Sequence, residues 1–320
     1  MSAAEKFVQM FIAIFAFIAV MGLVLFLADR VRSRKGEVLQ TIAFVLPAAV
    51  LISVGLLYPG IRTIFESFKN AAGTEYVGID NYKEIFTNSG LLTVLRNTAI
   101  WVIVTPIVAT LIGLVYAVLI DKARIEAVAK ALIFLPMAIS LVGASIIWKF
   151  VYDYKATDET QIGLANQILK WIGLDTYRFL LTEPWNTIFL IVIMIWVQAG
   201  FAMTVLSASI KAIPDDIVEA ARLDGVSGFR MFRYITVPSI RPALIVVLTA
   251  ISITTLKVFD IVRTTTGGNF NTSVLANEFY TQSFRSFNNG LGAALAVLLF
   301  ILVIPIVVYN IRQMRKLEAR

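Results

Sequence analysis

Seven long apolar stretches are the feature that most constrains what this 320-residue chain folds into. A helix needs about 20 apolar residues, rising about 1.5 Å each, to cross a hydrocarbon layer of about 30 Å. The sequence therefore predicts an all-α polytopic membrane protein with about seven transmembrane helices. The expected spans are 7–28, 39–60, 97–120, 131–150, 188–210, 242–262 and 291–311.

The composition excludes a soluble domain and most enzyme classes. Hydrophobic residues make up 58% of the chain and charged residues 15%, against roughly 45–50% and 25% in a typical globular protein. The chain contains no cysteine and no histidine. It therefore lacks disulfides and thiolate metal sites, the commonest metal ligand and the commonest general base.

The first apolar stretch is expected to be a retained anchor. One basic residue precedes it, and four basic residues follow it within 30–35. This is the pattern of a stop-transfer segment, whereas a cleaved signal peptide has a shorter apolar run behind a positive N-terminus. We predict an N-terminal anchor with a basic cytoplasmic linker in 1–38, followed by the main domain in 39–320.

The positive charges predict the orientation of the chain. One alternating set of loops holds 16 Lys and Arg in 60 residues, and the other set holds 10 in 107 residues. Because the basic loops of a membrane protein stay in the cytoplasm, we expect the N-terminus outside and the C-terminus inside. This bias also accounts for much of the net charge of +7 without a nucleic-acid partner. The cytoplasmic set comprises 30–38, 121–130, 211–241 and 311–320.

Loop 211–241 has the local signals of two short helices with a sharp corner. Pro214 suits the start of a helix, and the acidic residues that follow it favour a helix N-terminus. Residues 217–223 form the first predicted helix, and Gly225 allows the backbone to turn. A second helix is expected through Phe229 and Ile235. A connecting loop that folds on itself is the alternative interpretation.

This segment resembles the cytoplasmic EAA motif of ABC importer permeases. The family pattern is Glu-Ala-Ala, three residues, Gly, nine residues, Ile, one residue and Leu-Pro, and the chain matches it in register with Val226 and Val237 as conservative departures. In the family this coupling loop docks in a cleft of the ATP-binding subunit. The resemblance implies these coupling residues: Glu219, Ala220, Ala221, Arg222, Asp224 and Gly225.

Further similarity points to the maltose-type permeases of the carbohydrate uptake class. The segments 77–82, 96–98 and 289–294 resemble conserved segments of that class, while Asn269 departs from its Gly-Gly-Pro turn. The resemblance implies a six-helix permease core plus one N-terminal helix in a bacterial cytoplasmic (inner) membrane.

The same resemblance implies the partners and the cargo. It implies a second homologous permease, two ATP-binding subunits, an extracytoplasmic sugar-binding protein and surrounding membrane lipid. No cofactor is expected on this chain, and ATP and Mg are expected on the ATP-binding subunits. The cargo would be an α-linked disaccharide or a related oligosaccharide, with a polyol, glycerol phosphate or amino sugar as the alternative.

Polar residues inside apolar spans are the candidates for the substrate pathway, because such residues are costly in lipid. The alternative is that buried hydroxyls bond to carbonyls of their own helix. Lys257 and Asp260, three residues apart, are expected either to form a neutralising pair or to line the polar pathway, with a proton relay as the other alternative. The candidate pathway residues are Gln198, Phe201, Thr254, Thr255, Val258 and Asp260.

Two other function classes remain as alternatives. A secondary transporter would need coupling carboxylates or broken helices in several spans, and Asp260 is the one carboxylate that the predicted spans offer. A membrane enzyme would need an acid, a base or a nucleophile at one depth, and the sequence shows no such set. The chain also has no Gly-x-x-x-x-Gly-Lys-[Ser/Thr] loop for ATP. We therefore expect a transport subunit that performs no chemistry itself.

Overall fold

The computed structural model describes residues 3–29, 34–121, 124–156 and 158–318. Within these ranges all the regular structure is helical, and one isolated β-bridge joins Lys69 to Tyr76. The predicted all-α fold class is confirmed. The chain divides into two compact units, Met1–Phe65 and Glu66–Arg320, and the domain boundary expected after residue 38 stays a prediction. The two units are described separately.

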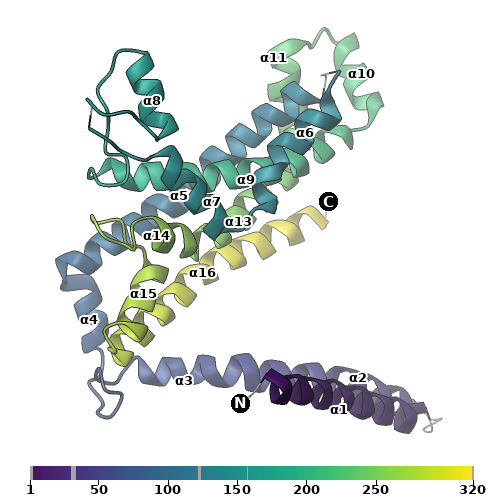
Figure 1. The fold of residues 1–320 in the computed structure, drawn as a ribbon. Coiled ribbons are helices and arrows are strands. Elements are labelled where there is room, and N and C mark those ends of the chain that lie inside the picture. The colour runs from purple at the N-terminus through teal and green to yellow at the C-terminus, as the bar shows by residue number, and fades with distance from the viewer. Residues whose placement is uncertain (1–2, 30–33, 122–123, 157, 319–320) are drawn as a thin grey trace. The chain divides into compact units, whose positions relative to one another are not determined.

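The first unit consists of helices that leave apolar side chains on their surface. Helix α1 (Ala3–Asp29) packs along α2 (Arg34–Ile52), and a π-helical segment (Ser53–Leu57) joins α2 to α3 (Tyr58–Glu66) (Figure 1). The helical run Phe44–Glu66 is apolar enough to span a membrane, and none of its most apolar stretch is buried within the chain. Part of the predicted basic linker, residues 30–33, lies outside the described residues.

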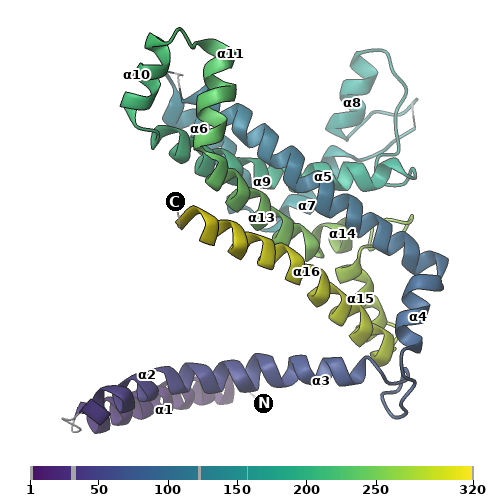
Figure 2. The same cartoon turned by 180° about the vertical axis from the view of Figure 1, so that it is seen from behind.

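Two long helices, α5 (Ser89–Ile120) and α9 (Trp185–Lys211), form the centre of the second unit (Figures 1 and 2). A Cβ atom on Gly113 would come within 2.4 Å of the Ala202 Cβ atom, so glycine is required where the helices approach each other. Trp101 of α5 is fully buried in a cluster with Leu190 and Met194 of α9. Helix α16 (Asn289–Glu318) packs on the same unit through α13 (Arg241–Leu256) and α15 (Leu275–Phe284).

The predicted span 131–150 is broken rather than continuous. Helix α6 (Glu126–Phe134) runs into a 3₁₀ segment (Leu135–Ala138), and α7 (Leu141–Val151) leaves at an angle of 102°. Ser140 begins α7 by accepting a hydrogen bond from the Gly143 N–H at 3.1 Å. Proline in the 3₁₀ segment cannot donate the backbone hydrogen bond that a continuous helix would need.

The predicted span 242–262 also differs from the structure. Helix α13 ends at Leu256, three residues follow without helical structure, and α14 (Asp260–Thr265) is a separate helix. Before α13, a helical run made of α11 (Gly228–Met231), a π-helical segment (Phe232–Thr236) and α12 (Val237–Ser239) meets it at 69°. This run is the second helix predicted for loop 211–241.

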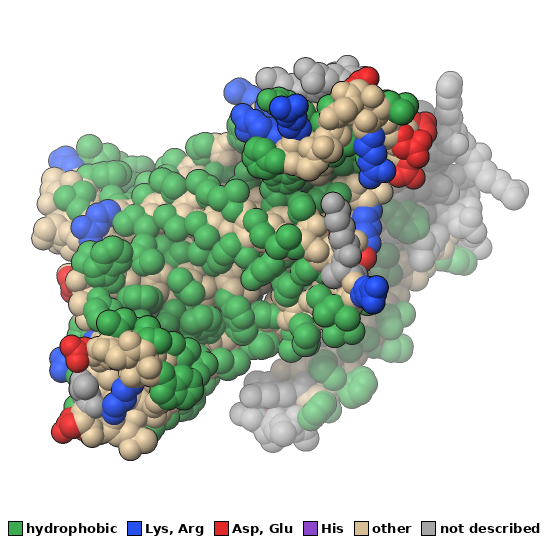
Figure 3. Space-filling view, turned by 90° about the horizontal axis from the view of Figure 1, so that it is seen from above, with side chains coloured by type: hydrophobic (Ala, Val, Ile, Leu, Met, Phe, Trp, Pro, Cys, Tyr) green, Lys and Arg blue, Asp and Glu red, His purple; other side chains and the backbone are tan. Residues whose placement is uncertain are grey.

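Short helices lie at the two ends of the second unit. Helix α10 (Asp215–Leu223) and α11 occupy one end, while α4 (Asp80–Thr87) and α15 occupy the other (Figure 1). Helix α8 (Leu164–Trp171) is the only α-helix in the segment between α7 and α9, all of which is described except residue 157. Figure 3 shows a broad band of hydrophobic side chains, with charged side chains gathered toward its ends.

Four helices of the described residues are long and apolar enough to cross a membrane, or six spans if each bent pair counts as one. The four are Phe44–Glu66, Ser89–Ile120, Trp185–Lys211 and Asn289–Gln313. The described apolar part of α1, Phe7–Leu23, is shorter than these. The count of seven spans and the orientation of the termini stay predictions.

Candidate functional site

Loop 211–241 folds as its local sequence signals predict. Helix α10 begins directly after Pro214, whose carbonyl oxygen accepts a hydrogen bond from the Ile217 N–H at 3.1 Å. Asp215 and Asp216 occupy the first turn, where carboxylates face the positive end of the helix dipole. The start of α10 is therefore stabilised by residues of the loop itself.

The end of α10 is a glycine corner. Gly225 has φ +79°, a conformation that side chains disfavour. The Val226 N–H donates to the Ala221 carbonyl oxygen at 2.9 Å, and the Gly225 N–H donates to the Arg222 carbonyl oxygen at 3.0 Å. This pair of bonds is the Schellman motif, which satisfies the last carbonyls of a helix and reverses the chain.

Helix α10 turns most of its side chains away from the protein. Among the candidate coupling residues, Ala221 is 6% exposed and is the one that packs inward. Two large apolar side chains of the loop stand in the open, with Leu223 89% and Phe229 73% exposed. The exposed candidate coupling residues are Glu219, Ala220, Arg222, Asp224 and Gly225.

A largely apolar cavity of about 760 Å³ separates this loop from the end of α5. Leu114 and Val118 of α5 line one side, and Phe229 and Phe232 line the other. The cavity keeps α11 apart from α5. This part of the loop is therefore less tightly packed against α5 than α9 is.

A charge cluster joins the base of loop 211–241 to three helices. The Lys130 ammonium group bonds to Asp121, to Ser207 and, at 2.8 Å, to Glu126. Ser207 donates to Asp121 at 2.6 Å, and Lys211 pairs with Glu126. Asp121 follows α5, Glu126 starts α6, and Lys211 is the last residue of α9 before the loop. The cluster therefore fixes the position from which the loop departs.

Several hydroxyls of α9 and α13 bond to a carbonyl of their own helix, which is the alternative that the sequence left open. Ser252 donates to the Leu248 carbonyl oxygen at 2.8 Å, and Thr254 donates to the Ala250 carbonyl oxygen at 2.9 Å. Thr204 of α9 does the same, to Gly200 at 2.9 Å. These groups need no ligand to satisfy them.

Three other pathway candidates lie on α9 and α13, which contact each other. Thr255 is fully buried, and its hydroxyl oxygen has no hydrogen-bond partner among the described residues. Gln198 is half-buried and, within the same described residues, its amide forms no hydrogen bond. Phe201 is half-buried against the apolar core between these helices. Among the described residues, three candidates therefore have side-chain polar atoms without a hydrogen-bond partner: Gln198, Thr255 and Asp260.

The predicted contact between Lys257 and Asp260 is absent. Lys257 is exposed, Asp260 is half-buried at the start of α14, and in the described part of the chain they form no ion pair. The pair does not form because α13 ends at Leu256, so helical spacing does not apply across these residues. The alternative, that both residues line the pathway, stays a prediction. Val258, 3% exposed, likewise lies beyond α13 and packs in the core with Ile191.

Most of the charge cluster was not among the residues predicted from the sequence. The Glu126 and Lys130 pair has the four-residue spacing of a helical ion pair, which could have been recognised. Asp121 and Ser207 are 86 residues apart, and no local signal links them. Glu84 and Glu278, which line a cavity at the far end of α5, carried no sequence signal either.

These features define a helical membrane protein with an exposed, glycine-cornered loop between two of its spans. The family model for the binding-protein-dependent transport system inner membrane component matches residues 85–315, and the chain belongs to that family. It is a multi-pass permease of the cytoplasmic membrane, as the sequence predicted.

Curated relatives match along nearly their whole length. The chain is 43% identical to the osmoprotective compounds uptake permease protein GgtC of Synechocystis, with 86% of this chain and 99% of the relative aligned. It is 42% identical to the alpha-glucoside transport system permease protein AglF of Rhizobium meliloti, covering 84% and 80%. It is 29% identical to the trehalose/maltose transport system permease protein MalF of Thermococcus litoralis, covering 84% and 91%.

Solved structures share the fold at lower identity. A bacterial ABC transporter involved in the import of the acidic polysaccharide alginate matches with a TM-score of 0.75 and 22% identity, covering 89% of this chain and 99% of that one. The same kind of transporter, in complex with an alginate pentasaccharide-bound periplasmic protein, matches with a TM-score of 0.74. At this identity the likeness concerns the fold alone.

Proposed function

We propose that the chain is the transmembrane permease subunit of an ATP-driven, binding-protein-dependent sugar importer. The observation that carries this proposal is the exposed corner of loop 211–241, where Leu223 stands outward beside the motif residues Glu219 and Gly225. A loop that is ordered by its own hydrogen bonds and unpartnered on its outer face is suited to receive a moving subunit.

In this proposal the chain forms half of a translocation pathway and a second homologous permease forms the other half. Two ATP-binding subunits bind ATP and Mg and close on each other, and an extracytoplasmic binding protein delivers the cargo. The chain itself performs no chemistry, in keeping with a sequence that has no phosphate-binding loop. Closure of the ATP-binding subunits would rotate the helix bundles as rigid bodies through loop 211–241.

The proposed cargo is an α-linked disaccharide or related oligosaccharide. The support comes from two relatives, one named for alpha-glucosides at 42% identity and one for trehalose and maltose at 29%. Gln198 and Thr255, whose polar atoms are unpaired within the described chain, are the best-supported contacts for its hydroxyl groups. The proposed lining of the pathway also includes Phe201 of α9, Thr254 of α13 and Asp260 of α14. Val258 is buried, so it would only hold the neighbouring lining residues in place.

A second candidate cargo is a small osmoprotective solute, because a relative named for osmoprotective compounds is 43% identical. Uptake competition separates the two candidates. Labelled trehalose is offered to cells that express the transporter, with a tenfold to hundredfold excess of unlabelled α-glucosides or of polyols. Competition by α-glucosides alone supports the first cargo, and competition by polyols alone supports the second.

Co-purification tests the function class. A C-terminally tagged chain is expressed with its genomic neighbours and extracted in mild detergent. We expect a second permease and two ATP-binding subunits to elute with it, and the ATP-binding subunits to be lost when Glu219→Ala and Gly225→Val are combined. The matched control combines Glu75→Ala with Gly73→Val at the other end of the unit, since Gly73 also has a positive φ of +74°. A chain that elutes alone and still supports uptake contradicts the proposal and favours an ion-coupled transporter.

A further inference from the structure

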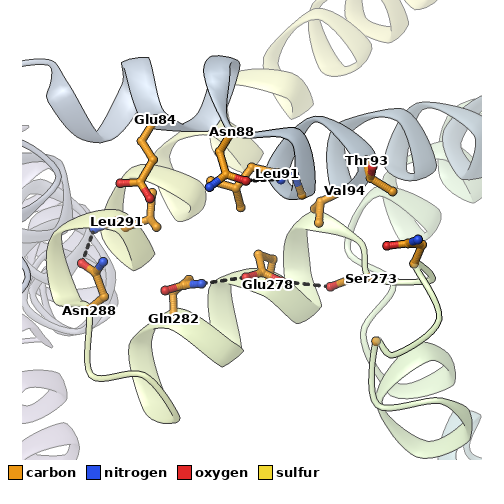
Figure 4. Close-up of a pocket in the computed structure, with 13 residues that line it drawn as sticks. Glu84, Asn88, Leu91, Thr93, Val94, Ser273, Glu278, Gln282, Asn288 and Leu291 are labelled. Atoms are coloured by element: carbon orange, nitrogen blue, oxygen red, sulfur yellow. Dashed lines mark hydrogen bonds between the residues drawn. The ribbon is translucent and has the colours of Figure 1, made fainter.

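A polar cavity lies at the end of the second unit opposite loop 211–241. It has a volume of about 320 Å³ and is bounded by α4, the start of α5, α15 and the turn before α15 (Figure 4). The 32 residues of α5 separate it from the loop, a distance of about 48 Å along a helix. This exceeds the hydrocarbon thickness of about 30 Å, so the two sites face opposite sides of the membrane. The lining residues that carry charge or hydrogen-bonding groups in their side chains are Glu84, Asn88, Thr93, Asn271, Ser273, Glu278, Gln282 and Asn288.

The walls of the cavity are held in place by hydrogen bonds. Asn97 of α5 donates to the carbonyl oxygens of Asn271 and Ser273 at 2.6 Å and 3.0 Å, which fixes the turn before α15. Asn88 accepts hydrogen bonds from the N–H groups of Gly90 and Leu91 and so caps α5. A site built from fixed walls loses less conformational entropy when it binds a partner.

The cavity carries two negative charges and no positive one. Glu84 and Glu278 extend into it from opposite walls (Figure 4). Glu278 accepts hydrogen bonds from Ser273 at 3.1 Å and Gln282 at 2.8 Å, and both donors are neutral. Glu84 is exposed, and its carboxylate forms no hydrogen bond or ion pair among the described residues. No Lys or Arg is among the described residues that line the cavity, so the two carboxylates lack a counter-charge.

The chemistry of the lining decides between possible ligands. No aromatic side chain lines the cavity in the described structure, so a sugar ring would find no face on which to stack. Within those same residues no group of three or more Asp, Glu, His or Cys side chains could hold a metal ion. Two carboxylates, of which Glu278 is held by hydrogen bonds, instead match the positive charge and the N–H donors of a lysine or arginine side chain.

We propose that this cavity receives a basic side chain of the extracytoplasmic binding protein, paired with Glu84 and Glu278. The inference rests on the proposed function, because it assumes that a binding protein docks on this side of the membrane. It adds the chemistry of the contact: a Lys or Arg on the binding protein enters a pocket that this chain leaves negatively charged. Such a charge pair contributes to docking and leaves the ATP-binding subunits untouched.

The test uses the full transporter in nanodiscs and titrates its cognate binding protein while ATP hydrolysis is measured. Glu84→Gln and Glu278→Gln remove the charges and keep the size of the side chains. We expect the double variant to raise the binding-protein concentration for half-maximal stimulation about tenfold. Added salt should raise that concentration more steeply for the wild type than for the double variant. Hydrolysis without binding protein should stay unchanged.

The matched control is Glu159→Gln, an exposed carboxylate in the segment between α7 and α9 that does not line the cavity. An unchanged half-maximal concentration in the assembled double variant overturns the inference, as does an equal effect of Glu159→Gln. If the double variant fails to assemble, the single Glu84→Gln variant decides, since Glu84 has no described partner to lose. A wild-type transporter that ignores every binding protein overturns the proposed function instead, and the inference falls with it.

Discussion

Loop 211–241 and the interior between α9 and α13 carry the two sets of candidate residues, and they meet their surroundings in opposite ways. In the loop, Leu223 and Phe229 are 89% and 73% exposed and face outward. In the interior, Thr249 and Ser252 donate hydrogen bonds to carbonyls of their own helix. The loop thus exposes groups that a partner would cover, while most of the interior hydroxyls are already satisfied.

This difference tells which candidates depend on a second molecule. A polar group that is bonded within its helix contributes to the fold whether or not cargo is present. An exposed apolar side chain on an ordered corner gains free energy only when a partner buries it. Within the interior, Thr255 and Gln198 resemble the loop residues more than their neighbours, because their polar atoms are unpaired among the described residues.

The largest effect is expected where the two regions join, at Lys130. Replacing it by methionine, Lys130→Met, removes the cation that faces Asp121 and Glu126, and Asp121 has a side chain only 11% exposed. We expect the free energy of unfolding to fall by about 2 kcal/mol, because an uncompensated carboxylate stays partly buried. Titration of the purified protein with a denaturing detergent measures this change.

The control for Lys130→Met is Lys83→Met. Lys83 pairs with Asp80 at 2.8 Å, but both side chains are more than 60% exposed. Such a surface pair contributes roughly 0–1 kcal/mol. Equal losses in the two variants would mean that the charge cluster does not hold the base of the loop, and the two regions would then be independent.

The charge cluster also marks the limit of what the sequence could predict. The loop was predicted well because its signals are local: a proline, two aspartates and a glycine act on neighbouring residues. The positions at which the spans break were not predicted as well. Pro47, Pro106 and Pro305 lie inside continuous helices, whereas Pro136 lies at a break, so proline alone does not locate one. Tertiary packing decides which proline bends the chain.

The same reasoning explains the errors in the interior. Helical spacing linked Lys257 to Asp260, but it required α13 to continue past Leu256. Asp121, Ser207 and Lys130 come together only because the end of α5, the beginning of α6 and the end of α9 meet at one place, which no local pattern encodes. Long-range contacts of this kind need the fold.

The next largest effect is expected at the loop corner. Gly225→Val places a branched side chain on a backbone with φ +79°, although no atom lies within 4 Å of the new Cβ atom. The cost is therefore backbone strain of about 1–2 kcal/mol. It lowers the ratio of ordered to opened corner by a factor of roughly 5 to 30. We expect binding-protein-stimulated ATP hydrolysis to fall by that factor, and Gly225→Asn to be milder because asparagine tolerates this conformation.

Gly173→Val is the matched control for the corner. Gly173 has φ +80° and also has no atom within 4 Å of an added Cβ atom, but it lies after α8, far from loop 211–241. The backbone strain is the same and the location differs. If both valine variants reduce stimulated hydrolysis equally, the loss reflects stability, and the loop has no special part in coupling.

The smallest effect distinguishes two neighbouring threonines of α13. Thr255→Val removes a fully buried hydroxyl that has no described partner. Thr254→Val removes an exposed hydroxyl that bonds to Ala250. Because an unsatisfied buried hydroxyl carries a desolvation cost, Thr255→Val should raise the free energy of unfolding by about 1 kcal/mol, and Thr254→Val should change it by less than about 0.5 kcal/mol.

Transport measured alongside stability assigns the Thr255 hydroxyl. If Thr255 has only a structural role, Thr255→Val gains stability and keeps the wild-type uptake rate. Neither threonine would then depend on a second molecule, in contrast to the exposed residues of the loop. If stability rises while the affinity for cargo falls about tenfold, a loss of 1.4 kcal/mol in binding, the hydroxyl contacts cargo in another state of the transport cycle. The second result would mean that Thr255 resembles Leu223: each side chain lacks a partner within this chain because it contacts a second molecule during transport.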